Sequence, residues 1–192
     1  MGGVTEAARR MVASVREGRM NRTVSIRAAR VEDASRLREL GVVGWETTYA
    51  GFLRPENRRA YLNGPFWSVA RLRAIIEAAD CATLVAEIEG RVAGFLTLEP
   101  HPSGETELTR FYVDPSERGR GTGGELWQCA LAHLRASGTQ SILVNVFGDN
   151  RDGRHFYERL GFALIEETTT TVGEQTVYDV WYRMTVGEPD RL

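Results

Sequence analysis

The segment Arg118-Gly119-Arg120-Gly121-Thr122-Gly123-Gly124 places four glycines within seven residues. It follows an apolar run that ends at Asp114-Pro115, and it precedes a run with Leu126, Leu131 and Leu134 at helical spacing. Glycines let the backbone approach a phosphate closely, and the free N–H groups at a helix start favour negative charge. A pyrophosphate is therefore a natural ligand of this strand-to-helix turn.

Two other interpretations of the turn stay open on glycine content alone. It can be a flexible loop that merely permits a tight connection. It can also bind a dinucleotide, because Gly119, Gly121 and Gly124 satisfy the pattern GxGxxG. Two observations argue against dinucleotide binding. Fewer than 70 residues follow the motif, and the apolar run 142–146 contains no acidic residue that could bind a ribose hydroxyl. A Walker A loop is excluded because the chain contains no lysine.

The remaining patterns predict the order β, α-rich, β, β, β, α, β, α, β, β. An early strand at 24–28 precedes a helix that begins near 31–34 and carries an apolar stripe of Leu37, Leu40 and Val43. Short helices and loops are expected over 45–79. The later elements are expected at 82–88, 92–98, 107–113, 121–136, 141–146, 152–160, 162–171 and 175–185. This order predicts an α+β (mixed α/β) fold rather than regular βαβ alternation.

One folded domain accounts for these elements. We expect it to span residues 22–186, preceded by a candidate disordered arm at 1–21 and followed by a tail at 187–192.

Composition excludes several classes of function. The chain contains no apolar run long enough to span a membrane and no early secretory signal, so we expect a cytoplasmic protein without a membrane partner. The net charge of −2 gives no broad reason to bind nucleic acid. The two cysteines, Cys81 and Cys129, are expected to be buried. They and the three histidines lack metal-ligand spacing, so no metal cofactor is expected.

Two separated motifs resemble the GNAT superfamily of acyl-CoA-dependent N-acyltransferases. The run 108–115 and the R-x-x-G-x-G core at Arg118, Gly121 and Gly123 resemble the family's strand and pyrophosphate loop. Asn150 followed by Phe156-Tyr157-Glu158-Arg159-Leu160-Gly161-Phe162 is similar to its second signature, and the similarity covers roughly residues 24–184. The resemblance implies a GNAT-like central mixed, mostly antiparallel sheet of about seven strands. Flanking helices and a splayed parallel strand pair would complete this fold.

The resemblance also implies a site for acetyl-CoA without a metal. It places Phe111, Tyr112 and Val113 along the cofactor, and the backbone from Arg118 to Gly124 around its pyrophosphate. Asn150 would hold the pantetheine arm, and Phe156 belongs to the same set of cofactor contacts. One departure is Gly153, where the family usually has alanine. Glycine removes bulk there, so we expect local looseness rather than lost binding.

Two candidate catalytic residues follow from the same resemblance. Tyr157 matches the tyrosine that donates a proton or hydrogen bond to the departing thiolate, although aromatic residues at helical spacing are ordinarily core. Glu107 is the candidate base that receives a proton from the amine through water, and a solvated edge residue is the alternative interpretation.

The function implied is an N-acetyltransferase that moves an acetyl or other short acyl group to an amine by direct attack in a ternary complex. A non-catalytic acyl-CoA-binding regulatory module is the alternative. The acceptor would be a small-molecule or peptide amine. Six aromatic residues are available for its wall, most of them expected to be core: Trp45, Tyr49, Phe52, Tyr61, Phe66 and Trp67. The terminal strands offer a candidate surface for a homodimer.

Overall fold

A seven-stranded sheet forms the centre of the protein. The computed structural model describes residues 23–187, so the predicted arm and, apart from Gly187, the predicted tail lie outside the described residues. The strand order is β1-β2-β3-β4-β5-β7-β6. Neighbouring strands are antiparallel except for β4 and β5, which are parallel. The predicted α+β class with one parallel pair is confirmed.

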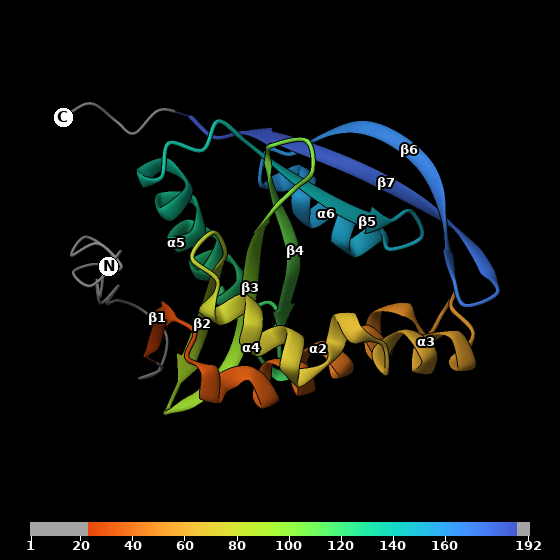
Figure 1. Ribbon diagram of the computed structural model, residues 1–192, viewed down its shortest axis with the longest axis horizontal. Coiled ribbons are helices and arrows are strands. Elements are labelled where there is room, and N and C mark those ends of the chain that lie inside the picture. Colours follow the sequence, from red (N-terminus) through yellow and green to blue (C-terminus); the bar gives the residue numbers. More distant parts are fainter. Residues whose placement is uncertain (1–22, 188–192) are drawn as a thin grey trace.

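The elements follow the predicted order along the chain (Figure 1). The strands are β1 (Val24–Ala28), β2 (Ala82–Ile88), β3 (Arg91–Pro100), β4 (Thr106–Val113), β5 (Ser141–Phe147), β6 (Ala163–Val172) and β7 (Gln175–Thr185). The helices are α2 (Ala34–Tyr49), α3 (Pro55–Leu62), α4 (Val69–Glu77), α5 (Thr122–Ala136) and α6 (Arg151–Arg159). Short 3-10 turns occur at Val31–Asp33, Pro65–Trp67 and Pro115–Glu117.

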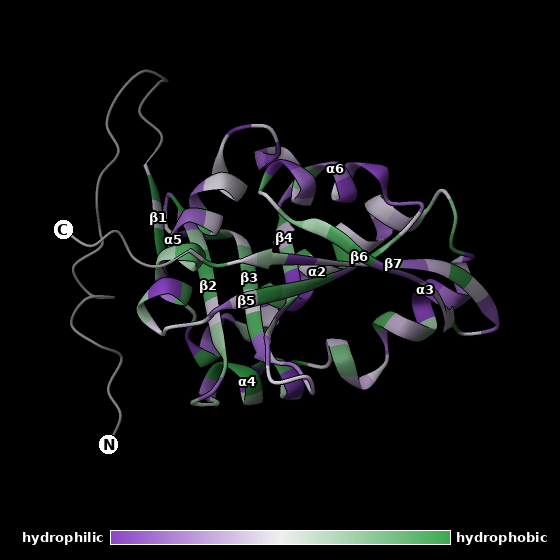
Figure 2. Ribbon diagram, turned by 90° about the horizontal axis from the view of Figure 1, so that it is seen from above, coloured by the Kyte–Doolittle hydropathy of each residue, from purple (hydrophilic) through white to green (hydrophobic). Residues whose placement is uncertain are grey.

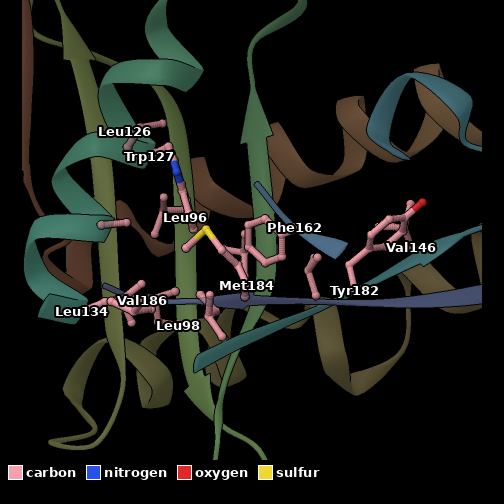
Figure 3. Packing of buried hydrophobic residues seen from close by; sticks show 14 of the residues in the cluster. Leu96, Leu98, Leu126, Trp127, Leu134, Val146, Phe162, Tyr182, Met184 and Val186 are labelled. Atoms are coloured by element: carbon pink, nitrogen blue, oxygen red, sulfur yellow. The ribbon is translucent and has the colours of Figure 1, made fainter. Parts of the chain in front are cut away.

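Helices cover both faces of the sheet. Seen from above, α6 and α4 lie on opposite sides of the strands (Figure 2). The face under α5 is packed by Leu126, Trp127 and Leu134, which meet Leu96 and Leu98 of β3 (Figure 3). Burial of each of these leucines contributes about 1.5–3 kcal/mol relative to leaving it exposed. These apolar residues hold α5 against the sheet. They therefore fix the position of its N-terminus, which lies in the glycine-rich turn.

Helix α2 packs on the opposite face of the sheet, and the residues that it buries differ in part from the predicted apolar stripe. Leu37 and Leu40 are buried as expected, but Val43 is 44% exposed. The buried face continues instead through Gly41 and Gly44, because large aromatic rings pack directly on the helix backbone there. A Cβ atom at Gly41 would lie 1.9 Å from the ring of Trp67.

The cysteines also differ from expectation, since Cys81 and Cys129 are half-buried rather than fully buried. Burial raises the pKa of both thiols, with nearby Asp80 adding to the effect at Cys81 and bringing its pKa to about 11. Both side chains are therefore thiols, not thiolates, at neutral pH.

The β6–β7 hairpin reaches across to α3 and the loop before it (Figure 1). The Gln175 side chain donates from Nε2 to the carbonyl oxygen of Phe52 at 2.6 Å, and its Oε1 accepts from the backbone N–H of Arg54 at 3.0 Å. At the hairpin tip, Asn57 Oδ1 accepts from the backbone N–H of Glu174 at 3.4 Å. These bonds join two segments that are distant in the sequence.

Candidate functional site

The two parallel strands separate soon after they meet. Among the described residues, β4 and β5 pair only at Thr106 with Ile142 and at Glu107 with Leu143. β4 nevertheless continues to Val113 and β5 to Phe147. The edge of β4 that faces β5 therefore has no strand partner from Leu108 onward, and it can receive an extended ligand.

A bulge in β4 accompanies this separation. Leu108 pairs with Leu98, and Arg110 pairs with Thr97, so Thr109 is an extra residue in the strand. An extra residue bends a strand and increases its local twist.

A buried ion pair holds the bulge. The Arg110 side chain is fully buried, and its Nη1 donates to Glu99 Oε1 at 2.6 Å. Thr109 also donates to Glu99, while Arg110 Nη2 donates to the carbonyl oxygen of Phe66. Burial lowers the pKa of Arg110, and the attraction of Glu99 opposes that shift. The bent geometry of β4 therefore depends on a charge pair away from solvent.

The separated strands form a cleft of about 860 Å³. Four segments line it: β4 from Leu108 to Val113, β5 from Val144 to Val146, the glycine-rich turn, and α6 with the two residues before it. The end of α2 closes it with Thr47, Thr48 and Tyr49. Most predicted site residues contribute to this wall: Phe111, Tyr112, Val113, Arg118, Gly119, Gly121, Gly123, Gly124, Asn150, Phe156 and Tyr157.

Three predicted site residues do not line the cleft. Arg120 is exposed on the turn, Thr122 is fully buried, and Glu107 lies where the two strands are still paired. The cleft and the predicted cofactor set thus overlap closely but not completely.

The glycine-rich turn requires glycine at two positions. Gly119 has φ of 71° and Gly121 has φ of 92°, a left-handed conformation that favours glycine. Gly121 is the N-cap of α5 and lines the cleft, so the positive end of the helix dipole lies at the cleft wall. Arg118 is exposed and donates to Val113 O and to Thr47 Oγ1, both at 3.4 Å. This end of the cleft is suited to an anion.

Asn150 is folded back onto its own helix. Its Oδ1 accepts from the backbone N–H of Gly153 at 3.0 Å and caps α6. It also forms a hydrogen bond with the side chain of Tyr49, which lowers the pKa of that phenol against the larger opposing effect of burial. Asn150 therefore links α6 to the end of α2 across the cleft.

Tyr157 lies in the cleft wall on α6. Its ring contacts Phe156 and Phe162 edge-on, with centroids 5.4 and 5.6 Å away. Burial raises the pKa of Tyr157, and the nearby Tyr49 raises it further. The phenol consequently keeps its proton at neutral pH and is available as a donor.

Glu107 lies on the other face of the sheet from the α5 core. Burial raises its pKa, the neighbouring Glu99 raises it further, and His101 and Arg110 oppose these effects. The charge of Glu107 also raises the pKa of Tyr61. A half-buried carboxylate with a raised pKa has the character of a general base.

The expected aromatic wall divides into core and surface. Trp67 is fully buried and Trp45 nearly so, whereas Tyr49 and Phe52 line the cleft. Trp45 stacks on Tyr61 with centroids 4.2 Å apart, and its Nε1 donates to Tyr112 Oη at 3.0 Å. The aromatic cluster thus positions β4 as well as the cleft wall.

Sequence reasoning missed two polar residues beside this cluster. Asn145 of β5 lines the cleft, and its Nδ2 donates to the carbonyl oxygen of Val180 on β7 at 3.5 Å. Its side chain also lowers the pKa of the neighbouring buried carboxylate of Asp179, against the larger opposing effect of burial. The only available signal was the alternation of Val177, Asp179 and Trp181, which places them on one face of a strand.

Residues 23–187 contain neither a candidate metal site nor a helix that could span a membrane. No group of three or more His, Cys, Asp or Glu residues in this range could hold a metal ion. No helix in the same range has the length and apolar character needed to cross a membrane.

Comparison with known proteins matches residues 45–162 to the model of the "Acetyltransferase (GNAT) family". Among curated relatives, the mycothiol acetyltransferase of Saccharomonospora viridis is 34% identical over 125 residues, which cover 57% of this chain and 41% of the relative. That of Thermomonospora curvata is 37% identical over 112 residues, covering 55% and 38%. The chain thus spans about two fifths of the length of these relatives.

Solved structures share the fold. PaiA N-acetyltransferase from Thermoplasma acidophilum, in complex with coenzyme A, matches with a TM-score of 0.70 and 24% identity. The match covers 81% of this chain and 97% of that one. Ard1 from Thermoplasma volcanium matches with a TM-score of 0.65 and 19% identity, over 86% of this chain and 99% of that one.

Proposed function

Because this chain belongs to the GNAT acetyltransferase family, we propose that it transfers an acetyl group from acetyl-CoA to a small-molecule amine in a ternary complex. The separation of β4 from β5 beyond Glu107 carries the proposal. It supplies an unpaired strand edge for an extended arm, and it leads to a glycine-rich helix start for a pyrophosphate. The cleft volume of about 860 Å³ fits a ligand of this size.

The chain's own residues divide the chemistry between the two faces of the sheet. Bound acetyl-CoA would supply a thioester, whose carbonyl carbon accepts the amine and whose sulfur leaves. Unpaired backbone N–H groups near Phe111 and Tyr112 would stabilise negative charge that develops on the carbonyl oxygen.

Two side chains would handle protons. Glu107 receives, through water, the proton that the amine loses as the new C–N bond forms. Tyr157 donates a proton or hydrogen bond toward the leaving sulfur as the C–S bond breaks. Burial supports both proton-transfer roles, because it keeps the Tyr157 phenol protonated and raises the pKa of the Glu107 carboxyl group.

The first experiment measures acetyl-CoA binding by isothermal titration, with NAD as the control ligand. Selective, saturable binding of acetyl-CoA supports the cleft assignment. No binding, or a preference for NAD, contradicts it. A panel of amines then follows, and it includes acceptors from mycothiol chemistry because the curated relatives carry that name.

Tyr157→Phe separates a catalyst from a module that only binds acyl-CoA. A catalyst should lose about 10²-fold or more in kcat while its acetyl-CoA affinity changes little. Tyr178→Phe is the matched control, since Tyr178 is exposed on β7 and does not line the cleft. Tight acetyl-CoA binding without transfer to any amine would instead support the binding module.

A further inference from the structure

The outer side of α6 carries a row of basic residues. Arg151, His155 and Arg159 are four residues apart, so their side chains follow one another along the helix. All three residues are exposed. Together with Asp152 they line a hollow of about 450 Å³ in the protein surface. Arg151, His155 and Arg159 are called the basic row below.

The basic row adjoins the cleft between β4 and β5. Arg151 and Arg159 line that cleft as well as the surface hollow. Phe156, one helical turn before Arg159, ties α6 to the glycine-rich turn, because a Cβ atom built at Gly123 would lie 3.9 Å from its ring. The row therefore runs along the cleft beside the end that is suited to an anion.

The side chains of the two arginines have no partner within residues 23–187. Neither forms an ion pair or a side-chain hydrogen bond there, and His155 lies 4.0 Å from the carboxylate of Glu158. Arg154 on the inner side of the helix differs, since its Nε donates to Tyr182 Oη at 2.9 Å. The inner arginine thus holds α6 to the sheet, and the outer ones are available for a ligand.

Helix stability explains only part of the basic row. Arg159 lies in the last turn of α6, where a cation is favourable because the helix dipole is negative there. Arg151 is the first residue of the helix, where the positive end of the dipole disfavours a cation by about 0.3–1 kcal/mol. The position of Arg151 therefore requires another cause, and an anionic ligand supplies one.

We propose that the basic row binds the 3′-phosphate of CoA, so that the protein selects CoA over dephospho-CoA. The inference rests on the proposed function, in which the pyrophosphate of CoA lies at the glycine-rich turn. The 3′-phosphate is attached to the ribose that follows this pyrophosphate, so it belongs to the same end of the ligand. Arg151 and Arg159 suit it, because a guanidinium group can donate two parallel hydrogen bonds to phosphate oxygens.

Two carboxylates act against this binding. Asp149 and Asp152 both line the cleft, and Asp152 also lines the hollow. Asp152 lies in the first turn of α6, where a negative charge stabilises the helix. Its charge would repel a bound phosphate, so its removal should strengthen the binding of CoA. Arg151 and Asp152 are neighbours in the chain, yet their neutralisation should have opposite effects.

The test measures the dissociation constants of CoA and dephospho-CoA by isothermal titration. The wild-type protein should bind CoA about 10-fold or more tightly than dephospho-CoA at low salt, which corresponds to about 1.4 kcal/mol. Because the basic row is exposed, this preference should shrink in about 1 M salt, where charges are screened beyond about 3 Å.

The double variant Arg151→Gln with Arg159→Gln removes the two arginine charges. Its preference for CoA should fall to about 1- to 2-fold. Its affinity for dephospho-CoA should stay near the wild-type value, which also shows that the variant is folded. Asp152→Asn should instead raise the preference by about 2- to 5-fold. Arg73→Gln is the matched control and should change nothing, because Arg73 is exposed on α4 and lines neither the cleft nor the hollow.

Three results would overturn the inference. One is a wild-type protein that binds CoA and dephospho-CoA equally well, and another is a double variant that keeps the preference. The third is a double variant with a raised KM for the amine and an unchanged CoA affinity, which would place the anion on the acceptor. All three leave the proposed function intact, whereas a wild-type protein that binds neither CoA nor dephospho-CoA would contradict the proposed function itself.

Discussion

The side chain of Asn150 occupies the space that a side chain at position 153 would need. A Cβ atom built at Gly153 would lie 2.4 Å from Asn150 Nδ2 and 2.8 Å from its Cγ. The expected looseness at Gly153 is therefore replaced by a specific contact. Asn150 caps α6 and reaches Tyr49 because residue 153 has no side chain.

This relationship predicts strong coupling between positions 150 and 153. Gly153→Ala gains about 1 kcal/mol of helix propensity but displaces the cap, which costs about 1 kcal/mol. In the Asn150→Ala background there is no cap to displace, so Gly153→Ala gives only the gain in helix propensity. Chemical denaturation of the two single variants and the double variant should therefore give a coupling free energy of about 1 kcal/mol or more. Equal effects of Gly153→Ala in both backgrounds would show that the contact is absent in solution.

The left-handed backbone of Gly121 predicts a contrast within the glycine-rich turn. Gly121→Ala should destabilise the fold by about 1–2 kcal/mol, because its φ is 92°. Gly124 follows in the first turn of α5, and nothing lies within 4 Å of a Cβ atom built there. Gly124→Ala should therefore be neutral or stabilising by up to about 1 kcal/mol. Urea denaturation measures both, and similar losses at the two sites would contradict the assignment.

The buried ion pair at the β4 bulge predicts a large loss of stability. Glu99→Gln removes the anion that neutralises Arg110, whose side chain is fully buried, so unfolding should become easier by about 3–5 kcal/mol. Glu39→Gln is the control. It breaks an exposed pair with Arg36 and should cost less than about 0.5 kcal/mol. A Glu99→Gln variant as stable as the control would mean that the bulge does not depend on the pair.

The ion pair of Glu105 with Arg183 predicts a stability change in acid. Hydrogen bonds from Arg183 and Ser141 lower the pKa of Glu105 from 4.5 to about 2. Because the pKa of Glu105 is lower in the folded state, its charge stabilises the protein at pH values above the unfolded-state pKa. This stabilisation is lost as pH falls from about 4.5 to about 2. Melting temperatures across this window should fall less steeply for Glu105→Gln than for the wild type. Parallel curves would exclude the effect.

The buried carboxylate of Asp179 predicts the opposite dependence. Its raised pKa means that the folded state disfavours the charged form. Asp179 therefore destabilises the folded protein increasingly as pH rises from 3.8 through its folded-state pKa. Asp179→Asn should raise the melting temperature at neutral pH, and the gain should shrink below the ordinary aspartate pKa. A neutral-pH loss of stability would show that the charged carboxylate is already satisfied.

The sequence predicts the elements well because each carries a complete local signal. The apolar spacing of Leu126 and Leu134 indicates α5, and the glycine-rich run before it indicates its start. The aromatic and β-branched run of β4 likewise predicts a strand. These patterns depend on neighbours within one or two turns.

The site depends on relationships that no local pattern carries. The bulge at Thr109 is held by Glu99 on another strand, and the Asn150 cap needs the empty space at Gly153. Asp179 is one acid in an alternating strand, and only the register with Phe147 places it beside the aromatic cluster. Such features follow from tertiary packing, which overrides local preference.

The insertion of β7 between β5 and β6 sets an order on biosynthesis. Strands β1 to β5, the glycine-rich turn and α6 all precede β7 in the chain, so the ribosome releases every segment that lines the cleft before it releases β7. The Gln175 contact with the α2–α3 loop forms only after β7 emerges and enters the open edge of β5. A nascent chain can therefore bring together the elements that line the cleft before β7 completes the sheet between β5 and β6.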